Sequence, residues 1–209
     1  WKESDWTASD DRVRGGKSVS NLTVVDNKAA AVKFHGCLDI TALGGAGFAS
    51  QRTVDDHVPP FDLAAVGGYD TLVLDIIITS DNKSSDDNKY TIVLKDTVLP
   101  KRPDGREQST VSWEHDFTVS GTQKDAARND GSSSSIERRR IVVLRFGDFR
   151  PMYRGKPAED AKPLDWANIK RISIMIRSFF GEQEGPFTLY LSSIAACKES
   201  DLKMTLTSL

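Results

Sequence analysis

Short runs in which apolar and polar residues alternate are the main pattern along the chain. The most apolar or most regular runs span residues 69–79, 89–96, 111–119, 141–146, 171–179 and 187–194. Alternation with a period of two predicts strands that bury one face. Only the brief stretch 164–170 indicates a helix, so strands and helices do not alternate. The pattern therefore predicts an all-β fold, a β-sandwich of antiparallel strands.

Two polar stretches interrupt this pattern. Residues 81–88 (DNKSSDDN) predict the tip of a hairpin. Residues 121–140 are poor in apolar side chains and long for a connection, so they predict a mobile insertion. We expect its last three residues, Arg138–Arg140, to be a solvated loop end. With no internal repeat and no linker, residues 1–209 are predicted to form one domain.

The charge composition indicates which kinds of partner the protein is suited to bind. The 209 residues include 28 Lys and Arg against 30 Asp and Glu, a net charge of −2. A nearly neutral chain is not typical of proteins that bind nucleic acid through bulk electrostatics. No run approaches the length of a transmembrane helix, so no transmembrane segment is predicted. The two cysteines, Cys37 and Cys197, lack the spacing of metal ligands, and we expect neither a metal nor a cofactor.

Two glycine-rich segments resemble nucleotide-binding loops only in part. Gly16-Lys17-Ser18 matches the end of a phosphate-binding loop, but Asp11 stands where that motif needs its first glycine. The segment 44–47 lacks the strand–helix–strand frame of a dinucleotide site. We therefore expect no phosphate-binding loop at residues 16–18, and a glycine-rich turn between strands at 44–47.

Charged residues inside the predicted strands are the more informative signal. Four of them lie opposite the main apolar side of their strands, namely Asp75, Lys95, Glu114 and Arg177. If these strands share one sheet, the four side chains rise from one face and pair across strands. Such a face is either a solvated surface stabilised by ion pairs or a ligand-binding surface. Exposed ion pairs add little stability, about 0–1 kcal/mol each, so stability alone is a weak reason for the cluster.

Arginine and tyrosine add further candidate binding residues. Arg52 is a candidate for the same face, although it shares its parity with Phe48, which we expect in the core. The segment 146–162 reads as a long loop that carries Arg150, Tyr153 and Arg154. Arginine suits carboxylate or phosphate recognition, and tyrosine is enriched at interfaces. The alternative is a loop that merely covers the sandwich edge.

Several motifs, in order along the chain, resemble the complex I intermediate-associated protein 30 family. SDDRVRGGKSVS (9–20) is similar to the family's Asp-x-x-x-Gly-Gly-x-Ser signature, and GAGFASQRT (45–53) to its Gly-Phe-Ala-Ser-x-Arg-Thr strand. FGDFRPMYRGKP (146–157) and GPFTLYLSSI (185–194) match a later loop and the final strand. The resemblance implies a galactose-binding-like jelly-roll sandwich. It also implies a non-catalytic, chaperone-like mitochondrial protein whose partner is a respiratory complex subunit or assembly intermediate.

Two other functions stay open at this stage. Arg14 and the polar 121–140 stretch depart from the family pattern, which allows a stand-alone cytoplasmic paralogue. Such a paralogue would be a metal-free cyclase or isomerase that binds a small-molecule ligand. Its acid–base candidates are Asp75, Glu114 and His115, and its anion holders are Arg52, Lys95 and Arg177. A carbohydrate-binding module is the other alternative, and it requires exposed aromatic side chains on the binding face.

Overall fold

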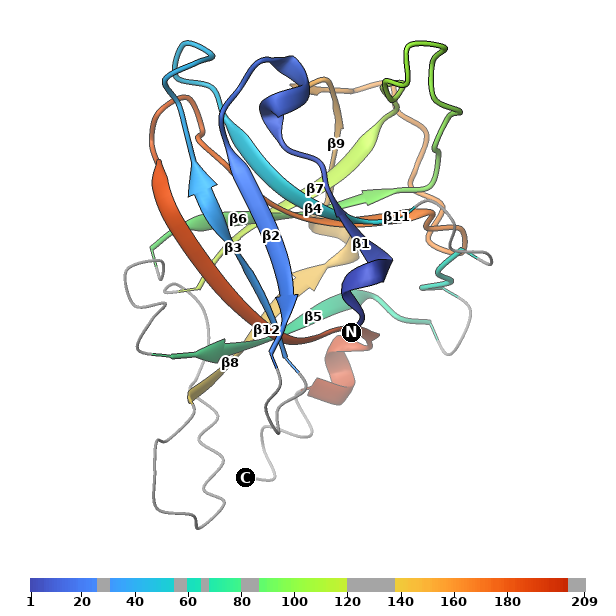
Figure 1. The fold of residues 1–209 in the computed structure, drawn as a ribbon. Helices are drawn as coiled ribbons and strands as arrows, with labels where there is room; N and C mark the ends of the chain where they lie inside the picture. The colour runs from blue at the N-terminus through green and yellow to red at the C-terminus, as the bar shows by residue number, and fades with distance from the viewer. Residues whose placement is uncertain (26–30, 55–59, 65–67, 80–86, 120–137, 203–209) are drawn as a thin grey trace.

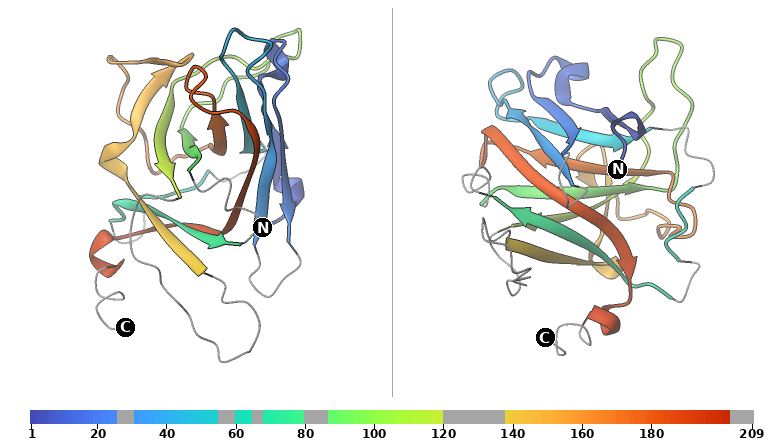
Figure 2. Two further views of the ribbon diagram at one scale, coloured as in Figure 1. Left: turned by 90° about the vertical axis from the view of Figure 1, so that its left-hand side faces the viewer. Right: turned by 60° about the horizontal axis from the view of Figure 1, so that its bottom comes forward.

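The computed structural model describes residues 1–25, 31–54, 60–64, 68–79, 87–119 and 138–202. Two antiparallel sheets pack face to face (Figure 1). Figure 2 (right) brings the smaller sheet forward, with β12 beside β5. The all-β prediction is confirmed, and the architecture is a jelly-roll sandwich.

The larger sheet has seven strands in the described residues. Their order is β1 (Trp6–Ala8), β4 (Phe48–Thr53), β11 (Arg171–Arg177), β6 (Lys89–Lys95), β7 (Ser112–Thr118), β9 (Arg150–Tyr153) and β10 (Lys156–Pro157). The smaller sheet has five, in the order β2 (Val19–Val24), β3 (Val32–Leu38), β12 (Gly185–Cys197), β5 (Thr71–Ile78) and β8 (Arg138–Arg145). Short 3-10 turns are η1 (Glu3–Asp5), η2 (Asp11–Arg14) and η4 (Phe146–Asp148), and residues 199–202 are helical. No helix in the described part of the chain is long and apolar enough to cross a membrane.

The core lies between the sheets and follows the predicted alternation. In β6, Tyr90, Ile92 and Leu94 are fully buried on the inner side. Aromatic rings join the two layers, because Tyr90 of β6 lies 6.4 Å from Phe34 of β3, centroid to centroid. Burying each such side chain stabilises the fold by about 1.5–3 kcal/mol. Because the core occupies the inner side of each strand, a ligand-binding site on the sheets has to use the outer side.

Three local predictions were wrong. Residues 138–140 begin β8 and pair with β5 rather than ending a loop, while residues 121–137 of the predicted insertion lie outside the described part. The strands on either side of the 81–88 stretch lie in different sheets, so it does not join a hairpin. Residues 164–170 form a turn and a bridge from Ile169 to Phe61 instead of a helix. In each case pairing with a distant strand overrides the local pattern.

The Asp-x-x-x-Gly-Gly-x-Ser signature forms a buried cluster around the carboxylate of Asp11, which we call the Asp11 cluster. Asp11 accepts hydrogen bonds from the Ser18 amide (3.0 Å), the Ser18 hydroxyl (2.7 Å) and the Phe48 amide (3.0 Å). Gly16 packs so closely that a Cβ there would lie 2.2 Å from the Asp11 carboxyl carbon. The signature therefore joins η2, β2 and β4 and provides a structural role for these residues.

Candidate ligand-binding face

The outer side of the seven-stranded sheet, which we call the polar face, carries most of the predicted binding residues. Cross-strand register places them together, because Val93 pairs with both Ser173 and Glu114, and Ser173 pairs with Arg52. Glu114 in turn pairs with Arg150 on β9. The predicted candidates that share this face are Arg52, Lys95, Glu114, Arg150 and Arg177.

Asp75 lies elsewhere, so the prediction that it joins the other charges on one face was wrong. It lies on the outer side of β5, in the five-stranded sheet, and its carboxylate accepts a hydrogen bond from Arg139 at 2.6 Å. The outward parity was right. However, the chain crosses from one sheet to the other between β5 and β6, and parity within a strand carries no information about such a crossing.

His115 is also separated from one of the carboxylates with which it was grouped. It alternates with Glu114 on β7, and its ring lies 5.2 Å from the buried Phe149 ring, centroid to centroid. Its Nδ1 lies 2.9 Å from the Asp116 carbonyl oxygen. Of the three candidate acid–base groups, Asp75 therefore lies on the other sheet, whereas Glu114 and His115 both line one hollow beside β7.

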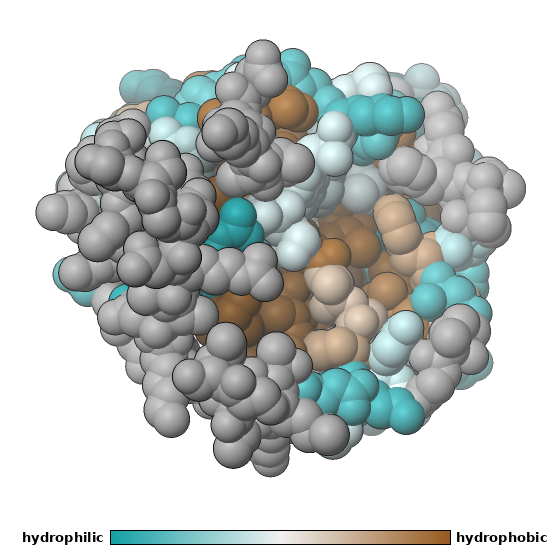
Figure 3. Space-filling model, turned by 90° about the horizontal axis from the view of Figure 1, so that it is seen from below, coloured by the Kyte–Doolittle hydropathy of each residue, from teal (hydrophilic) through white to brown (hydrophobic). Residues whose placement is uncertain are grey.

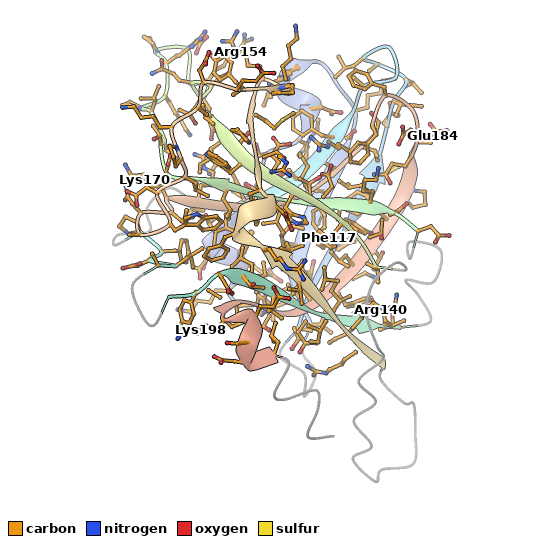
Figure 4. The ribbon with its side chains drawn as sticks, turned by 180° about the vertical axis from the view of Figure 1, so that it is seen from behind. Phe117, Arg140, Arg154, Lys170, Glu184 and Lys198 are labelled. Atoms are coloured by element: carbon orange, nitrogen blue, oxygen red, sulfur yellow. The ribbon has the colours of Figure 1, made fainter. Side chains whose placement is uncertain are left out.

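Tyr153 and Arg154 lie at the end of a β-hairpin, so the prediction of a continuous loop over 146–162 was wrong. Tyr153 ends β9 and is 42% exposed, and Arg154 begins the turn to β10. The Arg154 guanidinium lies 5.4 Å from the Tyr153 ring centroid, and its Nε donates to the Ser109 hydroxyl at 3.2 Å. Figure 4 shows Arg154 at the top of the molecule, far from Lys198 near the bottom. These two residues therefore mark the edge of the sheet rather than the middle of the polar face.

Arg177 organises one end of the polar face. Its guanidinium donates to Glu114 at 2.6 Å and to both carboxylate oxygens of Asp116 at 2.8 and 2.9 Å. The Phe179 ring lies against the same guanidinium, with its centroid at 4.7 Å. The Nε of Arg177 is buried and has no hydrogen-bond partner among the described residues.

An open hollow of about 460 Å³ lies beside this network. It is lined by Glu114, His115, Asp116, Asp148, Arg150, Met152 and Arg177. Charges of both signs therefore surround it, as expected for a surface that recognises polar groups. Within the described residues, no group of three or more His, Cys, Asp or Glu side chains is arranged to hold a metal ion.

A second charged cluster occupies the other end of β11. The side chains of Arg52 and Arg171 are only 10% and 6% exposed, and both donate to the carboxylate of Glu107, Arg171 at 2.8 Å. Lys95 lies directly across from Arg171 and donates to the Thr110 hydroxyl at 3.1 Å. Burial, followed by the neighbouring charge of Arg171, lowers the pKa of Lys95 from its ordinary value. Arg52, Lys95 and Arg171 thus lie around the carboxylate of Glu107.

The side of the molecule that carries the five-stranded sheet is different in character. Seen from below (Figure 3), apolar side chains gather at its centre. Outward residues of that sheet include Val73, Ile77 and Tyr190, of which Ile77 and Tyr190 pair directly across strands. Charged groups with ligand-binding chemistry are therefore concentrated on the opposite sheet.

Sequence reasoning missed four residues of these clusters. Arg171 and Asp116 share the outward parity of Arg177 and Glu114, so the alternation contained the signal that identifies them. Glu107 comes from the connection between β6 and β7, and Phe179 from the turn after β11. Neither has a periodic signal, because only the tertiary fold brings these segments to the sheet.

A jelly-roll sandwich with one polar face is the architecture of galactose-binding-like domains. A family 11 carbohydrate-binding module from Clostridium thermocellum, solved with a β-1,3-1,4-mixed-linked tetrasaccharide, is similar in fold. Its TM-score is 0.51 at 14% identity, over 90% of this chain and 88% of that chain. The family described as Complex I intermediate-associated protein 30 (CIA30) matches residues 2–130 and 132–191, and the chain belongs to this family. The chain is also 40% identical over 200 residues to the uncharacterized protein C9E9.15 of Schizosaccharomyces pombe, covering 94% of this chain and 79% of that protein.

Proposed function

We propose that this protein is a non-catalytic, chaperone-like binding protein whose partner is a subunit or assembly intermediate of mitochondrial complex I. The observation that carries the proposal is the match to the CIA30 family over most of the chain. Of the three candidate acid–base groups, Asp75 lies in the other sheet from Glu114 and His115, so the predicted set does not meet at one substrate. Acid–base catalysis requires such groups within reach of one substrate. Membership of the CIA30 family supports the choice of partner and a mitochondrial location.

The polar face and the β9–β10 edge supply the proposed binding surface. Arg150 is exposed on β9, next to Glu114, and Tyr153 is exposed at the end of the same strand. Arginine and tyrosine are enriched among the residues that contribute most to protein interfaces. A partner that covers this edge would also cover the hollow beside Arg177.

A carbohydrate-binding role has weaker support. Phe48 and Phe179, two of the aromatic side chains next to the polar face, each have a cationic side chain against the ring. Arg14 lies 5.7 Å from the Phe48 centroid, and Lys89 lies 4.3 Å from the Phe179 centroid. Sugar platforms need an accessible aromatic face, so the likeness to a carbohydrate-binding module supports the fold alone.

The test is deletion of the gene followed by measurement of assembled complex I on native gels. We expect the amount of assembled complex I to decrease in the deletion strain and to recover when the wild-type gene is returned. Arg150→Glu should fail to restore it, because the change reverses the charge of the proposed surface. Normal complex I in the deletion strain would overturn the proposed partner.

A matched control is available outside the proposed binding surface. Lys17→Glu makes the same change of charge at an exposed position. Lys17 comes just before β2 of the five-stranded sheet, away from the β9–β10 edge. It should restore assembly fully, and equal failure of both variants would contradict a role for the polar face.

A further inference from the structure

The turn after β11 exposes a phenylalanine more fully than any other large apolar side chain in the described part of the chain. Phe180 is 90% exposed, and Val13, at 72%, comes next. Single exposed apolar side chains are common on protein surfaces and need no partner. Phe180 differs from them because the chain also holds it in an unfavourable backbone conformation.

Two bulky residues of this turn have a left-handed backbone. The φ angle is 45° at Phe179 and 61° at Phe180. This region is unfavourable for residues with a Cβ, and bulky side chains rarely adopt it. Local strain of this kind persists where the surrounding structure imposes it, and it is found chiefly at functional sites. Neither burial nor backbone preference therefore accounts for a phenylalanine at position 180.

Hydrogen bonds to two neighbouring segments fix residues 178–183, which we call the Phe180 turn. The Ser178 hydroxyl donates to the Gly45 carbonyl at 2.9 Å and accepts from the Gly47 amide at 3.0 Å. The Gln183 side chain accepts from the Lys89 amide at 2.9 Å and donates to the Lys89 carbonyl at 2.8 Å. Because the backbone is held in place before binding, a partner would not have to order it.

The Phe180 turn adjoins the polar face. The Phe179 ring lies 4.7 Å from the Arg177 guanidinium, and Arg177 lines the same hollow as Arg150 of β9. Glu184, just beyond the turn, lies at the margin of the molecule in Figure 4. A partner that covers the hollow therefore reaches the Phe180 turn as well.

We propose that Phe180 is an apolar anchor that inserts into a pocket of the protein partner bound on the polar face. The inference rests on the proposed function, because it concerns that same partner. Aromatic side chains are enriched in the buried centre of protein interfaces, where few residues contribute most of the affinity. A rigid turn that presents one exposed phenylalanine beside the polar face fits this role.

The charges beside Phe180 favour a protein over a membrane as the occupant. Glu182 and Glu184 are both exposed within four residues of it, and Glu182 lies 4.0 Å from Lys89. Segments that attach to anionic lipid are rich in lysine and arginine, whereas this turn carries carboxylates. The pocket is therefore apolar, with a basic group at its rim that faces Glu184.

Replacing Phe180 by asparagine removes the anchor without straining the turn. Asparagine adopts the left-handed region more readily than phenylalanine, so Phe180→Asn should unfold at the wild-type temperature or above. At equal protein level in the deletion strain, it should leave assembled complex I near the level without the gene. Loss of an anchor weakens an interface about tenfold or more. Full rescue by Phe180→Asn would overturn the proposal.

Leu99→Asn is the matched control. Leu99 is exposed and follows the end of β6, whereas the Phe180 turn is bonded to Lys89 at the start of that strand. This variant should restore complex I fully, and equal failure of both variants would overturn a specific role for Phe180. Normal complex I in the deletion strain would overturn the proposed function itself. Rescue by Phe180→Asn in a strain that needs the gene would overturn the anchor alone.

Photo-crosslinking tests the contact directly and serves if the asparagine variant does not fold. p-Benzoylphenylalanine at position 180 keeps an aromatic side chain, and the same residue at position 150 reports on the polar face. Both positions should cross-link to the same complex I subunit, and position 99 should not. A subunit cross-linked from position 150 but not from position 180 would overturn the anchor.

Two measurements on the purified chain test the other occupants. Cosedimentation with vesicles of phosphatidylcholine and cardiolipin should show no binding that Phe180→Asn reduces. Sedimentation equilibrium should show no self-association that the variant abolishes. The first effect would assign the anchor to a membrane and the second to another copy of this chain, and either would overturn the proposal.

Discussion

Replacing Asp11 by asparagine is the sharpest test of how the family signature holds the sandwich together. Asp11 is fully buried, and its carboxylate accepts three hydrogen bonds from Ser18 and Phe48. Asparagine has nearly the same volume, so the change removes acceptor capacity without opening a cavity. One amide oxygen retains two of the donors at most, and the amide nitrogen then faces the third.

The expected magnitude follows from that geometry. A hydrogen bond to a charged group contributes roughly 1.5–3 kcal/mol, and a buried donor left unpaired costs about 1–3 kcal/mol. Losing one such bond at Asp11 and weakening two gives a loss of about 2–4 kcal/mol in the free energy of unfolding. Since domains have only about 5–15 kcal/mol in total, the variant should be visibly unstable.

Urea unfolding followed by tryptophan fluorescence measures this loss. We expect the midpoint to fall by about 1–2 M with an unchanged slope, because the slope reports the surface exposed on unfolding. Asp160→Asn makes the same chemical change at an exposed position and should alter stability by no more than about 0.5 kcal/mol. Equal midpoints for the two variants would refute the role given to the Asp11 cluster.

Two further changes test neighbouring parts of the fold. Gly16→Ala puts a Cβ 2.2 Å from the buried Asp11 carboxyl and should cost about 1–3 kcal/mol or prevent folding, whereas Gly147→Ala, with open space around it, should be nearly neutral in thermal unfolding. His35 has a pKa below its ordinary 6.5, chiefly through burial, so the unfolded chain takes up its proton first as the pH falls. The stabilisation that neutral His35 contributes should be fully present above pH 6.5 and be lost as the pH falls below it. The free energy of unfolding of His35→Gln should therefore fall less than that of the wild type between pH 8 and 5.5. Identical decreases in the two proteins would contradict this.

Alternation predicted the faces of individual strands well, because burial decides which side of a strand is apolar. Lys95, Glu114 and Arg177 lie outward as expected, and their strands are neighbours in one sheet. Arg171, which sequence reasoning missed, has the parity of Arg177, so the same alternation also contained its position. For these residues the sequence alone indicates whether the side chain points inward or outward, because a strand has only two sides.

Sheet membership and loop contacts were not predictable in the same way. Asp75 has the correct parity but lies in the other sheet, because the connection from β5 to β6 crosses the sandwich. Glu107 has no periodic neighbours, and its position depends on where a long connection folds back across β11. Both outcomes are set by long-range packing, which a pattern of two-residue period cannot encode.

Among the described residues, the two ends of the polar face present different charges to a partner. At one end of β11, Arg52, Lys95 and Arg171 lie around the carboxylate of Glu107; at the other, Arg177 lies between the carboxylates of Glu114 and Asp116. The strand rise places these ends roughly 20 Å apart. A partner surface with charge of one sign would be attracted at one end of the face and repelled at the other. Complementary charges mainly set orientation and specificity, so a face of this kind favours a partner that presents an anion and a cation at that spacing.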